Sequence, residues 1–145
     1  MSRRPRKSVR PAVRLALAAR MAARPDHPFA IGVGPRLGYV LAARDWVLPY
    51  AVVSFVGISE RDTLTEEINA VFLQVMIFAR ESLAAEELAA AALDLFSGDP
   101  LSAADVHDFV LRRFGDVPTL PETQADTTVI WQAGVTLAGL VQTKP

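Results

Sequence analysis

The stretch INAVFLQVMIFA, residues 68–79, decides the fold. In a β-strand, successive side chains point to opposite sides. One side of this strand would carry Val71, Leu73, Val75 and Ile77, and the other Ala70, Phe72, Gln74, Met76 and Phe78. Both sets are largely apolar, which is typical of a central strand covered on both sides. We therefore expect a sheet built around this segment.

Further strands are predicted on both sides of it. Residues 49–56, PYAVVSFV, are rich in β-branched and aromatic residues, and residues 37–42 fit a shorter strand. The polar residues 57–66 between the two strong strands predict an exposed hairpin connection. Residues 127–142 alternate, with one apolar side; the members of that side are Val129, Trp131, Ala133, Val135, Leu137 and Val141, while Ile130 and Leu140 are apolar exceptions on the other.

Helical patterns occupy other parts of the chain. The alanine-rich residues 12–23 and 81–97 have high helix propensity and helical spacing of their larger apolar residues. Residues 102–114 predict a short third helix, with Ser102 as its cap. The proline- and glycine-rich segments 25–36 and 115–126 predict loops.

The resulting expectation is one α+β domain, with a mainly antiparallel or mixed sheet of about four strands packed against two or three helices. We divide the chain into a basic N-terminal arm and helix, residues 1–24, and a body, residues 25–145. The chain has no cysteine, so disulfides and thiolate metal sites are excluded. Its hydrophobic content of 51% comes without the run of about 20 apolar residues that a membrane span needs. The surplus apolar surface is expected in the core or in contacts between subunits.

Charge is unevenly distributed along the chain. All sixteen acidic residues follow residue 24, and residues 1–24 are basic. The candidate basic arm comprises Arg3, Arg4, Arg6, Lys7 and Arg10. Three interpretations remain open: a solvated tail, a contact with nucleic acid or another acidic surface, and a transit peptide. The last is disfavoured by Pro5 and Pro11 and by the low serine content.

The sequence contains few residues in patterns that could support catalysis. His27 lies in a proline-rich segment. The residues around His107 are not spaced so that a nucleophile or an orienting partner would lie beside it. There is no paired-histidine metal motif, and the glycine-rich residues 32–38 lack the spacing of a phosphate-binding loop. We expect no enzyme activity, no cofactor and no metal. An enzyme whose site forms only between subunits is the remaining catalytic alternative.

The order of the elements resembles one known family. The segments that carry the resemblance are PYAVVSFV at 49–56, QVMIFAR at 74–80, LAAEELAAAALDLF at 83–96 and TVIWQAGVTLAGLVQ at 128–142. A proline-led strand, a strand that ends in an aromatic–x–Arg pattern, an alanine-rich helix and a long terminal strand follow one another in this way in the tail terminator (tail completion, minor tail) proteins of long-tailed phages, prophages and gene transfer agents. The resemblance covers residues 37–142; the basic arm and the helix expected near 102–114 depart from it.

The resemblance implies a structural subunit of a virion or phage-like particle, assembled in the host cytoplasm. It implies a homo-oligomer, a hexameric ring, that ends the tail tube and joins it to the head connector. The implied partners are the tail tube protein and the head-connector or stopper protein. DNA would pass through the lumen without specific binding, and no membrane is involved. The alternatives are a stopper or neck component of the same particle and a nucleic-acid-binding module that uses the basic arm.

The connection at 57–67, GISERDTLTEE, is longer than a tight hairpin requires. Its charged residues are Glu60, Arg61, Asp62, Glu66 and Glu67. We expect this loop to contact a neighbouring ring or tube protein; the alternative is a solvated turn without a partner.

Overall fold

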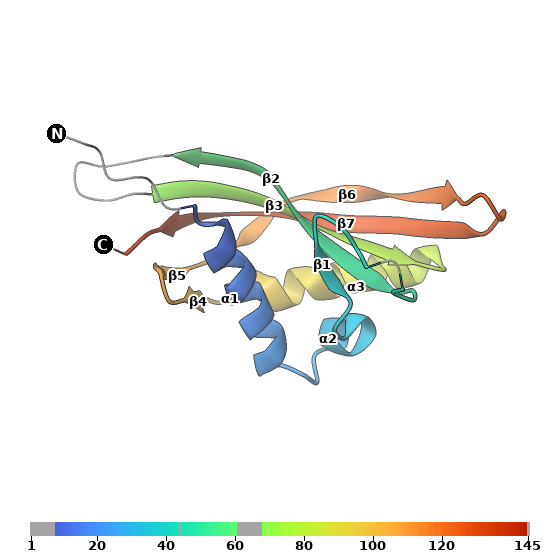
Figure 1. Ribbon diagram of the computed structural model, residues 1–145, viewed down its shortest axis with the longest axis horizontal. Helices are drawn as coiled ribbons and strands as arrows, with labels where there is room; N and C mark the ends of the chain where they lie inside the picture. Colours follow the sequence, from blue (N-terminus) through green and yellow to red (C-terminus); the bar gives the residue numbers. More distant parts are fainter. Residues whose placement is uncertain (1–7, 44, 61–67, 145) are drawn as a thin grey trace.

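The computed structural model describes residues 8–43, 45–60 and 68–144, and it has the α+β fold that the sequence predicts (Figure 1). The three helices are α1 (Arg10–Ala23), α2 (Pro28–Val33) and α3 (Ser82–Phe96). The strands are β1 (Leu37–Tyr39), β2 (Tyr50–Glu60), β3 (Ile68–Ala79), β4 (Leu101–Ala103), β5 (Val106–Phe109), β6 (Arg112–Thr123) and β7 (Val129–Gln142).

Five of the strands form one sheet in the order β1-β2-β3-β7-β6. β1 is parallel to β2, and the other pairs are antiparallel. β3 pairs along its whole length with β7, from Ile68 opposite Gln142 to Ala79 opposite Trp131. β4 and β5 form a separate two-stranded hairpin. β3 is therefore the central strand, as its sequence indicates.

The two sides of β3 have different surroundings. Val71, Leu73, Val75 and Ile77 are fully buried beneath the helices, whereas Phe72, Gln74, Met76 and Phe78 are half-buried. All three helices lie on one side of the sheet (Figure 1). The expectation that both sides are covered is therefore wrong for the residues that the structure describes. The apolar side chains on the second side are left without a layer over them.

α1 and α3 match their predicted positions and supply the helical side of the core. In α1, Ala12, Val13, Ala16 and Leu17 are buried, which is the spacing of one helix face. Leu15 lies on the opposite face and is 66% exposed. α3 buries Ala85, Ala92, Leu95 and Phe96, and Gly98 follows it with a φ of 88° that a residue with a β-carbon would adopt only with strain.

The predicted loop at 25–36 is wrong in its centre, where the structure has α2. Pro28 begins this helix, a position where its missing N–H costs nothing and its fixed φ fits. His27 caps the helix: its Nδ1 accepts a hydrogen bond from the backbone N–H of Phe29 at 3.1 Å. Phe29 is fully buried and meets the ring of Phe96 edge to face, with centroids 5.4 Å apart. The prolines here start a helix as well as end one.

The predicted helix at 102–114 and the predicted loop at 115–126 are also wrong. This region forms β4, β5 and β6. Val106 and Phe109 are buried, but Val110 is only half-buried and Phe114 is exposed, so the apolar residues do not share one helix face. Pairing within the β4–β5 and β6–β7 hairpins overrides the helical spacing. Pro118 and Pro121 fit in β6 because it is an edge strand, interrupted by bulges.

Candidate assembly surfaces

Most of the candidate contact residues lie outside the described residues: Arg3, Arg4, Arg6, Lys7, Arg61, Asp62, Glu66 and Glu67. Arg10 is the first residue of α1; it is exposed, and its guanidinium carbon lies 5.7 Å from the centroid of the Phe55 ring. Glu60 is the last residue of β2. Residues 57–60 therefore continue the strand, whereas the sequence had predicted that they belong to the loop. A contact role for these residues stays a prediction.

The side of the sheet away from the helices forms a broad surface, which we call the open face. Strand register places the following side chains of β2, β3 and β7 on it: Tyr50, Val52, Ser54, Ala70, Phe72, Gln74, Met76, Phe78, Gln132, Thr136, Ala138, Leu140 and Gln142. None of these side chains is charged. The solvent-facing side of a sheet normally carries polar and charged side chains. A face with this composition is therefore unusual for a surface in water.

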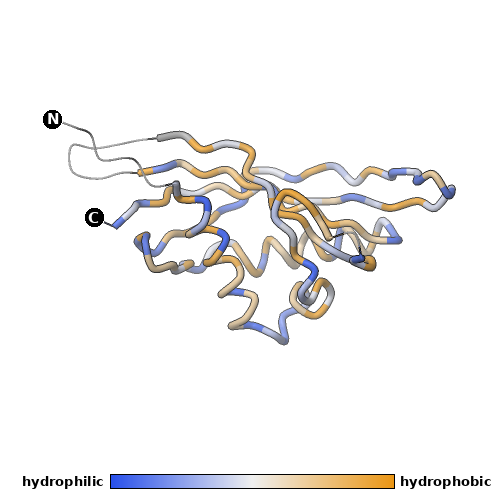
Figure 2. The backbone as a smooth tube through the Cα atoms, in the orientation of Figure 1, coloured by the Kyte–Doolittle hydropathy of each residue, from blue (hydrophilic) through white to orange (hydrophobic). Residues whose placement is uncertain are grey.

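Large apolar side chains stand out from the open face. Phe114, in the bulge of β6, is 67% exposed and Leu140 on β7 is 56% exposed. The ring of Phe114 meets that of Phe72 edge to face. Leu120, opposite Gln132 in the register of β6 and β7, is 57% exposed. Figure 2 shows apolar segments in several strands of the sheet. Across β2, β3 and β7 the face is therefore uncharged and partly apolar; on the edge strand β6 the register adds Arg112, opposite Ala138, and Glu122, opposite Ile130.

One end of the open face carries a row of aromatic and polar groups. The ring of Tyr50 stacks on that of Phe78 with centroids 5.0 Å apart, and the ring centroid of Trp46 lies 6.2 Å from that of Tyr50. Across the sheet, the side-chain amide of Gln132 donates to the carboxylate of Glu122. Burial raises the pKa of the Tyr50 hydroxyl, and the negative charge of Glu122 raises it further. Glu122, on β6, thus brings a negative charge to the edge of an otherwise uncharged row.

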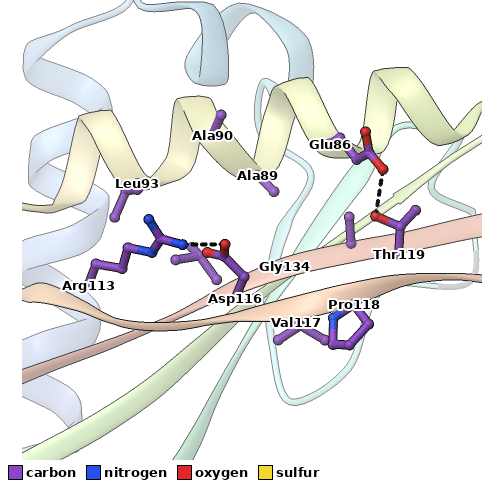
Figure 3. Close-up of a pocket in the computed structure, with 12 residues that line it drawn as sticks. Glu86, Ala89, Ala90, Leu93, Arg113, Asp116, Val117, Pro118, Thr119 and Gly134 are labelled. Atoms are coloured by element: carbon purple, nitrogen blue, oxygen red, sulfur yellow. Dashed lines mark hydrogen bonds and ion pairs between the residues drawn. The ribbon is translucent and has the colours of Figure 1, made fainter.

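A groove lies on the other side of the sheet, between α3 and β6 (Figure 3). Its volume is about 440 Å³, and its walls include Ala89, Ala90 and Leu93 of α3 and Ala133 and Val135 of β7. We call it the α3–β6 groove. Polar contacts flank the apolar walls: Thr119 donates to Glu86 at 2.9 Å, and Arg113 pairs with Asp116. Its mixed lining suits an apolar side chain with a polar or charged neighbour.

α1 is fixed to the body by arginine contacts. Arg20, whose side chain is largely buried, donates to the backbone oxygens of Leu95 and Pro100. The Arg14 guanidinium lies 4.1 Å from the centroid of the Tyr39 ring, and the Tyr39 hydroxyl donates to the Arg14 carbonyl oxygen at 3.1 Å. Burial raises the pKa of the Tyr39 hydroxyl, although the positive charge of Arg14 opposes the shift. These contacts hold α1 in one orientation, with Leu15 outward.

The histidines do not form a catalytic arrangement. His27 is mostly buried, and besides capping α2 it places Nε2 2.9 Å from Asp94 Oδ2. Sequence reasoning placed His27 in a proline-rich segment and missed this structural role; the His-Pro pair before an apolar run is the signal that could have found it. His107 is exposed on β5, not on a helix. Among the described residues, no cluster of histidine and carboxylate side chains could hold a metal ion. None of the described helices has the length and apolar character required to cross a membrane.

Comparison with known proteins identifies the family. Residues 15–131 match the profile of the family described as tail completion protein gp17. A search of curated proteins found no match. Among solved structures, a chain from the "Virion of native gene transfer agent (GTA) particle" has a similar fold, with a TM-score of 0.63 at 15% identity; the alignment covers 94% of this chain and 99% of that one. Because the family profile spans most of the described body, the chain belongs to the tail completion protein gp17 family, a family of structural virion proteins.

Proposed function

We propose that this chain forms a ring, a hexamer, that ends the tail tube of a phage-like particle and joins it to the head connector. The observation that carries this proposal is the open face. The description of the family as tail completion proteins and the similarity of the fold to a chain of a gene transfer agent virion support the same role. The proposed partners are the tail tube protein and the head-connector or stopper protein.

Exposing apolar surface to water costs free energy. Phe114 and Leu140 are more than half exposed on a face whose β2, β3 and β7 residues carry no charge. Such a surface is favoured when another protein covers it, and an uncharged interface core is typical of stable assemblies. DNA binding needs several basic side chains, whereas Arg112 is the one basic residue that strand register places on the open face among the described residues of β2, β3, β6 and β7, so this face does not suit contact with phosphates. We therefore assign it to contact with another structural protein, while DNA passes through the lumen without specific binding.

A charged substitution on the open face tests the proposal. Leu140→Asp should leave the fold intact because the side chain is exposed, and it should prevent the joining of tails to heads. The matched control is Leu83→Asp, at a similarly exposed leucine on α3 away from the open face. Electron microscopy of particles made with each variant would show separate heads and tails for Leu140→Asp and joined particles for Leu83→Asp. Joined particles from a well-folded Leu140→Asp variant would refute the role of the open face.

A further inference from the structure

The α3–β6 groove marks a place where the helical layer ends before the sheet does. The groove residues Glu86, Ala89, Ala90 and Leu93 recur at the spacing of one face of α3. Leu88 points to another flank: a β-carbon added at Gly32 of α2 would lie 2.6 Å from its Cδ2 atom. α2 therefore occupies one flank of α3, and the groove occupies a different one, beside the edge strand β6. The position is one that a further helix could fill.

The charges near the groove indicate what such a helix would carry. Glu86 lies on the rim, Glu87 follows it as an exposed residue, and Asp116 stands on the β6 side. Arg113 is the basic residue that lines the groove, and it is already paired with Asp116. The surroundings are thus net acidic, with an apolar floor of small side chains. A helix with one protruding apolar side chain and neighbouring basic residues would complement them.

The outer face of α1 has these properties. Leu15 is 66% exposed, next to Arg14 and one turn from the exposed Ala18 and Ala19, which permit close approach of a neighbouring surface. α1 contains no acidic residue, and Arg10 adds a second positive charge at its start. The inner face of α1 is already buried against its own body, so its outer face is available to a different molecule.

We propose that the outer face of α1 from a second copy of this chain seats Leu15 in the α3–β6 groove, with Arg14 beside Glu86. The groove and α1 are different surfaces of one subunit, so the contact is heterologous, and repetition of it can close a ring. This inference rests on the proposed ring and supplies its subunit interface. It is separate from the open face, which stays available to the tube or connector protein.

Cysteine cross-linking in assembled particles tests the contact, because the natural chain has no cysteine. One copy would carry Leu15→Cys, and a second copy with a size tag would carry Ala90→Cys on the groove wall. A disulfide requires Cα atoms within about 7 Å, so it reports direct proximity. The matched control replaces Ala90→Cys with Ala125→Cys, at an exposed alanine at the end of the β6–β7 hairpin.

After oxidation, we expect a tagged–untagged disulfide dimer at about tenfold or more the yield of the Ala125→Cys control. Particles that contain both variants but give no excess over the control would overturn the interface and leave the proposed function standing. Absence of the chain from particles would overturn both.

A charge reversal supplies an independent readout in the full chain. Arg14→Glu should reduce incorporation into particles about tenfold, and adding Glu86→Arg to the same chain should restore most of the loss. Both side chains are exposed, but Arg14→Glu also removes the contact of the guanidinium with the Tyr39 ring, so circular dichroism of each purified variant must first show a folded subunit. A double variant that is no better than Arg14→Glu alone would contradict the pairing of α1 with the groove.

Discussion

The rings of Phe72 on β3 and Phe114 on β6 meet edge to face, with centroids 5.2 Å apart, on the side of the sheet that carries no described helix. An aromatic pair of this geometry normally belongs to a core or an interface. Here Phe114 is 67% exposed, so the pair is accessible to another molecule, as the proposed function requires. Under that proposal, folding of the subunit and assembly of the particle depend on separate sets of residues.

That separation can be measured with two phenylalanines. Phe114→Ala should lower the free energy of unfolding by only about 0.5–1.5 kcal/mol, because little more than the ring pair is lost. Phe96→Ala, at a fully buried ring, should cost about 3–5 kcal/mol. Urea denaturation of the purified chain would compare them. Phe114→Ala should nevertheless impair particle assembly; an assembly-competent Phe114→Ala variant would argue against the open face as a contact surface.

The two sides of β3 should respond differently to a carboxylate. Val75→Asp should prevent folding, because Val75 is fully buried and an unpaired charge there costs several kcal/mol. Gln74→Asp, one residue earlier on the open face, should still fold. Circular dichroism and gel filtration of both variants are sufficient. Similar behaviour of the two would mean that the open face is as enclosed as the helical side.

Substitution of the two histidines should have different effects on stability. His27→Ala should destabilise the fold by about 0.5–2 kcal/mol, the usual cost of losing a helix cap. His107→Ala should change neither stability nor particle assembly, because the side chain is exposed on a short strand. Thermal unfolding and an assembly assay would check both. Loss of assembly by a stable His107→Ala variant would require a functional site near β5.

The connection between β2 and β3 offers a test by shortening. Replacing residues 61–67 with an Asn-Gly turn should preserve the fold, since β2 and β3 keep their pairing up to Glu60 opposite Asn69. It should impair the joining of tails to heads if Arg61, Asp62, Glu66 and Glu67 contact a neighbouring protein, as the sequence suggests. Amide exchange on the free chain and on particles would measure ordering of the loop. Normal joining, with equal rapid exchange in both states, would favour a solvated turn.

We expect the stability of the turn between β6 and β7 to depend on pH. The Thr128 hydroxyl and backbone N–H both donate to Asp126, which lowers the pKa of its carboxyl below the ordinary value of 3.8. Because the folded pKa is depressed, the stabilisation of the turn is present above that ordinary value and is lost as the pH falls through the folded pKa. NMR titration should find the Asp126 pKa lowered, and Thr128→Val should raise it. An unchanged pKa in the variant would exclude the hydroxyl as a cause.

How much the sequence predicts depends on where the stabilising contacts are. The strand at 68–79 and the helix at 81–97 are predicted correctly because their spacing and propensity agree with their burial. The segment 102–126 is predicted wrongly because Val106, Phe109 and Phe114 have accidental helical spacing, and strand pairing in the β4–β5 and β6–β7 hairpins decides their structure. The family and fold class follow from the order of elements and are confirmed.

The candidate surfaces were harder to predict. Ile130 and Leu140, apolar residues on the polar side of an alternating strand, were the available signal for the open face. The α3–β6 groove gives no such signal, because its walls come from α3, β6 and β7, segments whose proximity depends on the topology of the sheet. The exposure of Leu15 could not be predicted, because the alanine-rich sequence of α1 does not distinguish the two faces of the helix.

The proposed ring between the tail tube and the head connector requires the open face of this chain to be covered by another protein. Electron cryomicroscopy of intact particles, at a resolution that traces the strands, would show whether it is. We expect a closed ring of this chain at the end of the tail tube, with Phe114 and Leu140 buried against a neighbouring protein. A map in which the chain is absent from the junction, or in which those two side chains face solvent, would contradict it.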